Sequence, residues 1–169
     1  MILVEADVSG EWDSSTDWAA LAHAAVRAAV EASGNASLLE QELTLEVSVK
    51  FAGDDEVRAL NAAWRGKDKA TNVLSFPMVE PGSIRSLPGA APGEILLGDV
   101  ILARGICLRE AEEKGIPFSD HAAHLVVHGT LHLLGYDHQE GGEAEAMEGI
   151  ERRALAGLGV ADPYMEVQS

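Results

Sequence analysis

Residues 128–138 are the part of the chain that most restricts how it can fold, because they place three histidines at metal-ligand spacing around a glycine. If the segment begins as a helix, His128 and His132 stand one turn apart on the same face, with Cβ atoms roughly 5–6 Å from each other. Gly135 is suited to the left-handed conformation that ends a helix. The chain can therefore turn back at this glycine and bring His138 to the same ion as a third ligand.

Three imidazole ligands leave one position of a tetrahedral ion open, as in catalytic zinc sites. Such an ion lowers the pKa of a bound water from about 15.7 to roughly 7, so the segment predicts a hydrolytic centre with one zinc ion. The alternative is that His128 and His132 are buried, hydrogen-bonded histidines and that His138 is a surface residue. The ligand spacing of all three around a glycine favours the metal site.

Two more histidines and an aspartate flank this set. His121 and His124 precede His128 at three- and four-residue steps, which puts them on the same helical face. They can be additional ligands or approach the substrate, but because the predicted ligand set is already complete, we expect them to pack in the core or to orient a ligand. Asp137 adjoins His138 and can orient a histidine by accepting its second N–H, or it only shapes the turn.

The intervals of the three histidines and the glycine equal those of the zinc-peptidase pattern H-E-x-x-H-x-x-G-x-x-H. One residue differs, since Gly129 occupies the position of the glutamate that acts as general base in the peptidases. A peptidase mechanism is therefore disfavoured. The base must come from elsewhere, the substrate must take part in the proton transfer, or the ion works mainly by polarising an oxygen.

The composition indicates one globular domain with an acidic surface. The 169 residues, of which 47% are hydrophobic, suffice for one core without extra crosslinks. A formal net charge of −16 argues against a general nucleic-acid coat protein, which needs clustered lysine and arginine. Arg65, Lys67 and Lys69 nevertheless lie together, with only Asp68 among them. They form a local basic edge.

Arg65 is a candidate phosphate ligand. Its guanidinium offers five donors in a planar fork and stays charged at physiological pH, which suits phosphate oxygens. The competing interpretation is a solvated arginine at a helix C-terminus, where cations are favoured, and the two neighbouring lysines are open to the same interpretation.

The sequence predicts a soluble cytoplasmic protein. The lone Cys107 cannot form an internal disulfide, and the first ten residues lack the charged start and apolar stretch of a secretory signal. No apolar run approaches the about 18 residues that a membrane span needs.

Hydrophobic periodicity predicts strands and helices in irregular order. Residues 43–51 alternate apolar and polar side chains, which is the period of a strand with one covered face. Further strands are expected at 2–8, 72–76 and 94–102, and helices over 104–114 and 143–158. Gly98 marks a bulge or a close approach, and the segment 79–94, rich in proline and glycine, is expected to be a surface loop or a lid. The irregular order favours an α+β fold, with a sheet packed against helices.

Other helices are expected to begin at polar residues. Ser14 with Asp17 resembles a capping box, and Asp54 and Ser119 are expected to cap later helices, the last of which carries the histidines. The helix after Asp54 is expected to bury Val57, Leu60 and Trp64 and to present Arg65 at its end.

Three segments carry a family resemblance. Residues 60–77 (LNAAWRGKDKATNVLSFP), 98–100 (GDV) and 124–138 (HLVVHGTLHLLGYDH) resemble, in the same order, the YbeY endoribonuclease family of ribosomal RNA maturation factors. The length and element sequence also fit, so the resemblance covers residues 1–169 as one domain. Many members have Thr-Asp where this chain has Thr71-Asn72, so we assign position 72 no catalytic role.

The resemblance implies a zinc-dependent endoribonuclease that cuts single-stranded RNA in the maturation of the 3′ end of 16S ribosomal RNA and in ribosome quality control. It implies one zinc ion held by His128, His132 and His138, with Arg65 as the catalytic residue that handles the RNA. The implied fold is a small α+β domain with a mixed four-stranded sheet and a zincin-like metal helix. The implied partners are precursor ribosomal RNA and, because the protein is acidic, small-subunit ribosomal proteins or an assembly GTPase that recruits it.

Two other functions fit the same residues. One is a zincin-like peptidase or amide hydrolase whose base comes from elsewhere. The other is a non-catalytic ribosome-assembly factor in which zinc fixes the C-terminal turn. An open coordination position argues against a purely structural ion, because structural zinc sites almost always fill all four positions with protein ligands.

Overall fold

The computed structural model describes residues 2–35, 43–79, 93–136 and 141–164. These residues contain a four-stranded sheet in the order β1-β2-β4-β3. Its strands are β1 (Ile2–Val8), β2 (Leu43–Ala52), β3 (Val73–Pro77) and β4 (Gly93–Ala103). β1 and β4 run parallel to β2, whereas β3 runs antiparallel to β4. The predicted α+β fold with a small mixed sheet is therefore confirmed.

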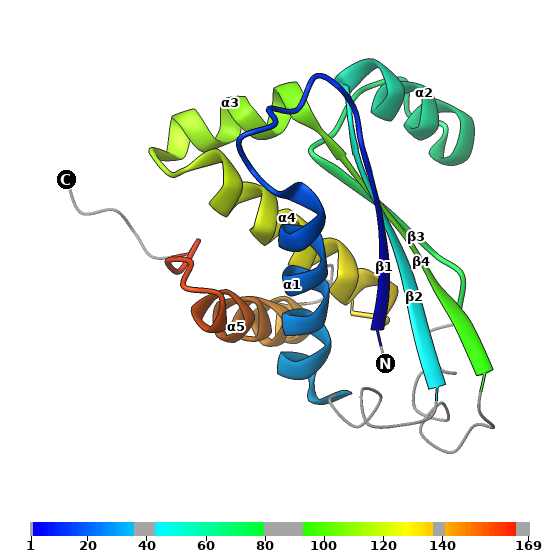
Figure 1. Ribbon diagram of the computed structural model, residues 1–169, viewed down its shortest axis with the longest axis vertical. Helices are drawn as coiled ribbons and strands as arrows, with labels where there is room; N and C mark the ends of the chain where they lie inside the picture. Colours follow the sequence, from blue (N-terminus) through cyan, green and yellow to red (C-terminus); the bar gives the residue numbers. More distant parts are fainter. Residues whose placement is uncertain (1, 36–42, 80–92, 137–140, 165–169) are drawn as a thin grey trace.

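The helices cover the two faces of the sheet unequally (Figure 1). They are α1 (Trp18–Val30) with a short continuation η1 (Glu31–Asn35), α2 (Asp54–Arg65), α3 (Arg104–Lys114), α4 (Phe118–Leu133) and α5 (Gly141–Gly157). α1 and α4 pack side by side, α4 lies against β3 and β4, and α5 contacts both α1 and α4. α2 packs on the other face, at one end of the sheet. None of the described helices is long and apolar enough to cross a membrane.

The alternation along β2 determines which face of the sheet is buried. Leu45, Val47, Val49 and Phe51 are at most 1% exposed and belong to the core that α1 and α4 complete. Fully burying such a side chain stabilises the fold by about 1.5–3 kcal/mol relative to leaving it exposed. A shift of the strand by one residue would turn all four side chains to solvent, so this pattern fixes the register.

α2 is a short amphipathic helix over the second face of the sheet. Val57 is fully buried there beside Ala52 and Ile101. Helical spacing predicts that Trp64 is buried on the same side, but its exposure is 73%. This prediction is wrong: Arg65, in the same turn, contacts β3, whereas the indole of Trp64 is turned to solvent.

Two predicted helix starts differ from the observed ones. α1 begins after Asp17, whose carboxylate accepts a hydrogen bond from the backbone N–H of Ala20 at 3.0 Å. Ser14 lies before the helix, so Asp17 is the cap. α4 begins directly after Pro117, which places Ser119 inside the first turn. The fixed φ of proline suits the start of a helix without a side-chain cap.

Two glycines let α4 approach the sheet closely. Gly98 lies at a register shift in the pairing of β4 with β2, which is a bulge, and a Cβ there would lie 2.4 Å from the carbonyl oxygen of Phe76. A Cβ on Gly129 would lie 2.7 Å from a methyl group of Val100. Both positions therefore exclude larger residues, and both interpretations of Gly98 are confirmed.

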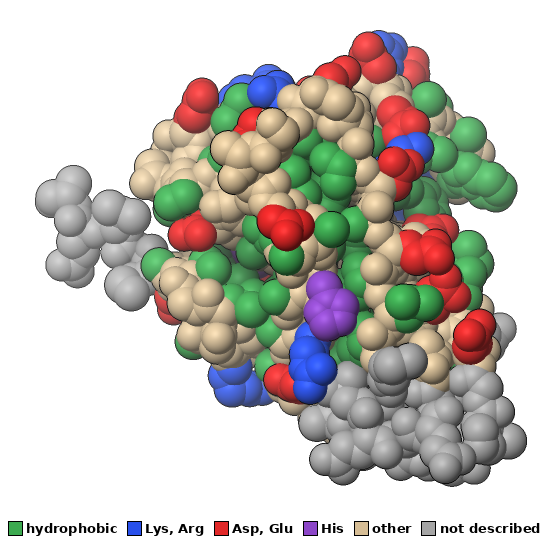
Figure 2. Space-filling view, in the orientation of Figure 1, with side chains coloured by type: hydrophobic (Ala, Val, Ile, Leu, Met, Phe, Trp, Pro, Cys, Tyr) green, Lys and Arg blue, Asp and Glu red, His purple; other side chains and the backbone are tan. Residues whose placement is uncertain are grey.

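Acidic side chains dominate much of the described surface. Figure 2 shows them along the strand side of the molecule and over its upper end. On the open face of the sheet, desolvation and the neighbouring carboxylates of Glu5 and Glu94 raise the pKa of Glu46. This crowding agrees with the net charge of −16 and disfavours binding of a polyanion to that face.

Candidate metal centre

α4 carries the candidate metal ligands and ends where the sequence predicts. Its end is closed by two backbone hydrogen bonds of 3.0 Å, from the N–H of Gly135 to the carbonyl of His132 and from the N–H of Tyr136 to the carbonyl of Leu131. Gly135 has a φ of 98°. These features form a Schellman motif, in which a glycine ends the helix and turns the chain. The segment that contains His138 starts from this turn.

His128 and His132 direct ring nitrogens toward each other. Their Nε2 atoms are 3.1 Å apart, and the ring centroids are 4.6 Å apart. Two nitrogens bound to one tetrahedral zinc ion at about 2.0–2.1 Å lie roughly 3.3–3.4 Å from each other. The side chain of His128 is 22% exposed, so the pair is open to solvent. These two side chains therefore fit a shared zinc ion.

A buried carboxylate of α5 holds the second ring nitrogen of His128. Glu151 is fully buried, and its Oε1 lies 2.5 Å from Nδ1 of His128. Its Oε2 accepts a hydrogen bond from the hydroxyl of Tyr164 and lies 3.5 Å from Nε2 of His124. When Nδ1–H donates to Glu151, Nε2 of a neutral His128 ring carries the lone pair that a metal ion needs.

Glu151 stays ionised in this setting. Burial alone would raise the pKa of its carboxyl, but hydrogen bonds with His124, His128 and Tyr164 outweigh burial and lower the pKa to about 2. Burial and the bond to Glu151 raise the pKa of Tyr164, so its hydroxyl remains a donor. The buried charge is thus balanced by hydrogen-bond donors.

The sequence does not single out Glu151 as a functional residue, because it is one of several glutamates in the segment 140–151. Its spacing is more informative than its charge. It lies four residues after Met147 and four before Leu155, and both of these are fully or almost fully buried. A carboxylate in the apolar stripe of a helix needs a buried partner. This signal predicts a partner but does not identify the histidine.

His121 belongs to a second buried network. Its Nε2 lies 2.9 Å from Oε1 of Glu110, which also accepts a hydrogen bond from Nδ2 of Asn72 at 3.1 Å. His121 is 1% exposed, and burial lowers its pKa, so the ring is neutral at neutral pH. Asn72 is therefore a donor to Glu110, and an aspartate in its place would set two carboxylates against each other.

Arg65 is the last residue of α2, as predicted, and it lies against β3. Its Nη2 donates to the carbonyl oxygen of Ser75 at 2.8 Å, and the guanidinium lies 5.6 Å from the centroid of the Phe76 ring. Arg65 remains exposed. Because α4 packs against β3 and β4, Arg65 and the histidine pair flank the same edge strand.

Three predictions fall on residues that the structure does not describe. They are the third ligand His138, its neighbour Asp137 and most of the loop 79–94. Among the described residues, no three histidine, cysteine, aspartate or glutamate side chains converge as a metal site. The three-histidine metal site therefore stays a prediction, of which the structure describes two candidate ligands.

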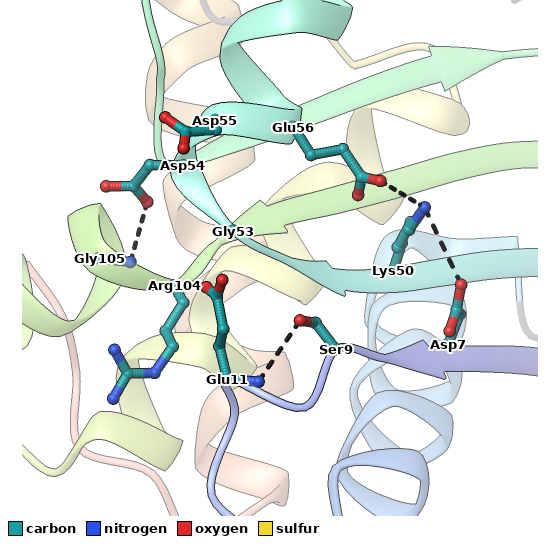
Figure 3. A pocket seen from close by; sticks show the side chains of 10 residues that line it. All are labelled: Asp7, Ser9, Glu11, Lys50, Gly53, Asp54, Asp55, Glu56, Arg104 and Gly105. Carbon is teal, nitrogen blue, oxygen red and sulfur yellow. Dashed lines mark hydrogen bonds and ion pairs between the residues drawn. The ribbon is translucent and has the colours of Figure 1, made fainter.

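A cavity of about 590 Å³, without α4 residues in its lining, lies beside the starts of α2 and α3 (Figure 3). Five carboxylates line it, from Asp7, Glu11, Asp54, Asp55 and Glu56. Lys50 bridges two of them, with Nζ 2.8 Å from Glu56 and 4.0 Å from Asp7. An acidic lining repels phosphate, so this cavity does not suit a nucleic acid.

Asp54 caps a different helix from the one predicted. Gly53 occupies the N-cap position of α2. The carboxylate of Asp54 instead accepts hydrogen bonds from the backbone N–H groups of Gly105 and Ile106, at 2.9 and 3.2 Å, in the first turn of α3. The prediction was wrong because this cap joins residues far apart in the sequence.

The chain is similar to known proteins over nearly its whole length. Residues 11–159 match the family described as Endoribonuclease YbeY. A Rhizorhabdus wittichii protein of that name is 56% identical over 164 residues, which cover 97% of either chain. A Zymomonas mobilis protein of that name is 49% identical over 166 residues, which cover 98% of this chain and 94% of that protein. A solution structure from Thermotoga maritima, 22% identical, shares the fold with a TM-score of 0.54, over 97% of this chain and 100% of that one. The chain therefore belongs to the YbeY endoribonuclease family.

Proposed function

We propose that this protein is a zinc-dependent endoribonuclease that cuts single-stranded RNA, with a role in maturing the 3′ end of 16S ribosomal RNA and in ribosome quality control. The observation that carries the proposal is the pair His128 and His132, whose Nε2 atoms lie 3.1 Å apart in a chain of the YbeY family. Relatives named endoribonuclease support RNA as the substrate.

We assign one zinc ion to His128, His132 and His138, the last supplied by the segment after the Gly135 turn. When bound, zinc with an open coordination position supplies a Lewis acid for a phosphoryl oxygen or a water molecule. With Nδ1–H of His128 donating to Glu151, Nε2 of the neutral ring carries the lone pair that a metal ion needs. The chain itself thus prepares one ligand before the ion arrives.

Arg65 is the residue that we assign to the phosphate. Its guanidinium is exposed beside β3 and is already oriented by Ser75 and Phe76. Charge builds on the phosphate in the transition state, and a fixed cation stabilises it. Removing one such donor costs about 2.7–4 kcal/mol in oxyanion sites, which corresponds to roughly a hundredfold to a thousandfold in rate.

The acidic surface makes a recruiting partner part of the proposal. A net charge of −16 disfavours unspecific binding to RNA, since that binding depends on clustered cations. Small-subunit ribosomal proteins or an assembly GTPase can supply the missing affinity at the ribosome. A role in ribosomal RNA maturation places the protein in the cytoplasm.

Cleavage of single-stranded and duplex RNA by zinc-loaded, nuclease-free protein tests the proposal. We expect His128→Ala to lose both zinc and activity, and Arg65→Ala to keep zinc while losing activity by about a hundredfold or more. Zinc content is measured by mass spectrometry in the same samples. Equal cleavage by all three proteins would exclude the nuclease assignment. Products that end in a 2′,3′-cyclic phosphate would identify the 2′-hydroxyl as the attacking group.

The two competing functions give different results in the same experiment. A peptidase or amide hydrolase would cut casein but not unstructured RNA. Because position 129 is a glycine packed against Val100, this outcome would require a general base from elsewhere in the chain. A non-catalytic assembly factor would bind zinc and cut neither substrate.

A further inference from the structure

Trp64 is an exposed tryptophan in a chain that buries its other two. Trp12 and Trp18 are 4% and 3% exposed, whereas Trp64 is 73% exposed. Helical spacing from Val57 would allow burial, yet the indole faces solvent although Arg65, in the same turn, contacts β3. Keeping a large apolar ring in water does not help folding. Contact with a molecule outside the chain explains this position better.

Basic residues follow the exposed indole in the next five positions. Arg65, Lys67 and Lys69 are exposed, and none of them forms an ion pair with a carboxylate of the described residues. The acidic residue among them, Asp68, is engaged by Nε of Arg58 at 2.8 Å. In a protein of net charge −16, this segment has a positive local charge.

The loop with the two lysines is held in place by Asn61. This residue is 3% exposed, its backbone carbonyl accepts from the N–H of Lys67 at 3.2 Å, and its Nδ2 donates to the carbonyl of Lys69 at 2.9 Å. Gly66 makes the preceding turn with a φ of 67°, which favours glycine. The backbone that carries Trp64 and the lysines is therefore held in place, which reduces the entropy lost on binding.

Arg65 connects this surface with the candidate metal centre. Its guanidinium reaches back to the carbonyl of Ser75 and the ring of Phe76, so it lies along β3. α4, which carries the histidine pair, packs against the same strand. Trp64 and Arg65 therefore belong to a surface that borders the strand on which the histidine helix packs.

We propose that Trp64 is a base-stacking site for single-stranded RNA, with Lys67 and Lys69 in contact with the adjacent phosphates. The inference rests on the proposed function and deepens it by naming a substrate-binding residue. Aromatic side chains stack on unpaired bases with little regard to sequence, and lysines follow the backbone. Bases inside a duplex are already stacked on their neighbours, so this surface selects single strands.

Equilibrium binding to the zinc-loaded full chain tests the stacking site. The probe is a short, fluorescein-labelled oligoadenylate with 2′-O-methyl sugars, checked to be intact afterwards, and the readout is fluorescence anisotropy. Trp64→Leu should weaken binding about 5- to 150-fold, which is the usual effect of losing one stacked base. Trp64→Phe keeps an aromatic ring and should stay within about threefold of the unaltered protein. An unlabelled oligoadenylate should quench tryptophan emission, because only Trp64 is exposed.

The salt dependence of binding separates the lysines from the indole. Lys67→Gln combined with Lys69→Gln should reduce the slope of log affinity against log salt by about 1.4, since each phosphate contact on a single strand contributes roughly 0.7. Trp64→Leu should leave the slope unchanged. Arg27→Gln combined with Lys114→Gln removes two exposed cations elsewhere and should change neither affinity nor slope.

Unchanged affinity of a folded Trp64→Leu variant overturns the stacking site, and this is also the result expected if the indole serves a protein partner instead. Circular dichroism and thermal melting check that the variant folds. If the unaltered protein cuts RNA and Trp64→Leu binds it equally well, only the stacking site fails. If RNA binds through Trp64 but is never cut, only the nuclease proposal fails. Absence of any RNA binding overturns both.

Discussion

Glu151 is the residue at which α4, α5 and the chain after α5 meet. Its Oε1 contacts Nδ1 of His128, and its Oε2 accepts a hydrogen bond from the hydroxyl of Tyr164 and lies near Nε2 of His124. A carboxylate behind a metal-binding histidine fixes the tautomer of the ring and raises its basicity. Removing the charge while keeping the shape of Glu151 should therefore affect the metal more than the fold.

Glu151→Gln should lower zinc affinity about 10- to 100-fold, measured by competition with a chelator of known affinity. Tyr164→Phe removes only one donor to the carboxylate, so it is the matched control and should have a smaller effect. Equal zinc affinity of the Glu151→Gln variant and the unaltered protein would show that this carboxylate does not position His128.

His121 should make the fold sensitive to mild acid. Burial lowers its pKa below the ordinary value of 6.5, so as the pH falls His121 is protonated in the unfolded chain before it is protonated in the folded chain. The free energy of unfolding should therefore decrease as the pH falls below 6.5, and His121→Gln should reduce this decrease. Urea unfolding at a series of pH values measures the effect. Parallel pH profiles for the two proteins would argue against it.

Among the elements, the contact between α4 and β4 determines where the histidines lie. Gly129 adjoins His128, and Val100 fills the space in which a Cβ would stand. A glutamate cannot occupy this position without displacing the helix from the sheet. The packing of two elements thus explains why the zinc-peptidase pattern is interrupted at this residue.

Gly129→Ala should lower the free energy of unfolding by about 1–3 kcal/mol, because the added methyl overpacks the contact with Val100. Gly149→Ala in α5 is the matched control, since the nearest atom to a Cβ there is Nη1 of Arg153 at 3.8 Å. That substitution should stabilise the protein by about 0.5–1 kcal/mol through helix propensity. Urea unfolding measures both, and equal effects would contradict the tight packing of α4.

Sequence patterns predict the features of these elements that depend on neighbouring residues. The alternation over 43–51 predicts a strand and its buried face, and Gly135 predicts the end of α4. The wrong predictions concern contacts between distant residues. Trp64 follows the helical period but is exposed, while the next residue, Arg65, contacts β3. Asp54 caps a helix about fifty residues later. Glu151 contacts His128, which lies 23 residues earlier in the chain.

For the whole molecule, the distribution of charge restricts where RNA can approach. Carboxylates surround the cavity between β1 and α2 and crowd the open face of the sheet. Segment 64–69 is basic despite the net charge of −16. RNA should therefore approach along α2 and β3, and a protein partner should contribute much of the affinity at the ribosome.

Anomalous diffraction at the zinc edge, from crystals of the zinc-loaded protein, shows whether one zinc ion is bound by the three histidines. We expect one zinc peak within about 2.0–2.1 Å of imidazole nitrogens of His128, His132 and His138, with no fourth protein side chain bound. A zinc peak at another place, or a fourth protein ligand at this one, would contradict this expectation.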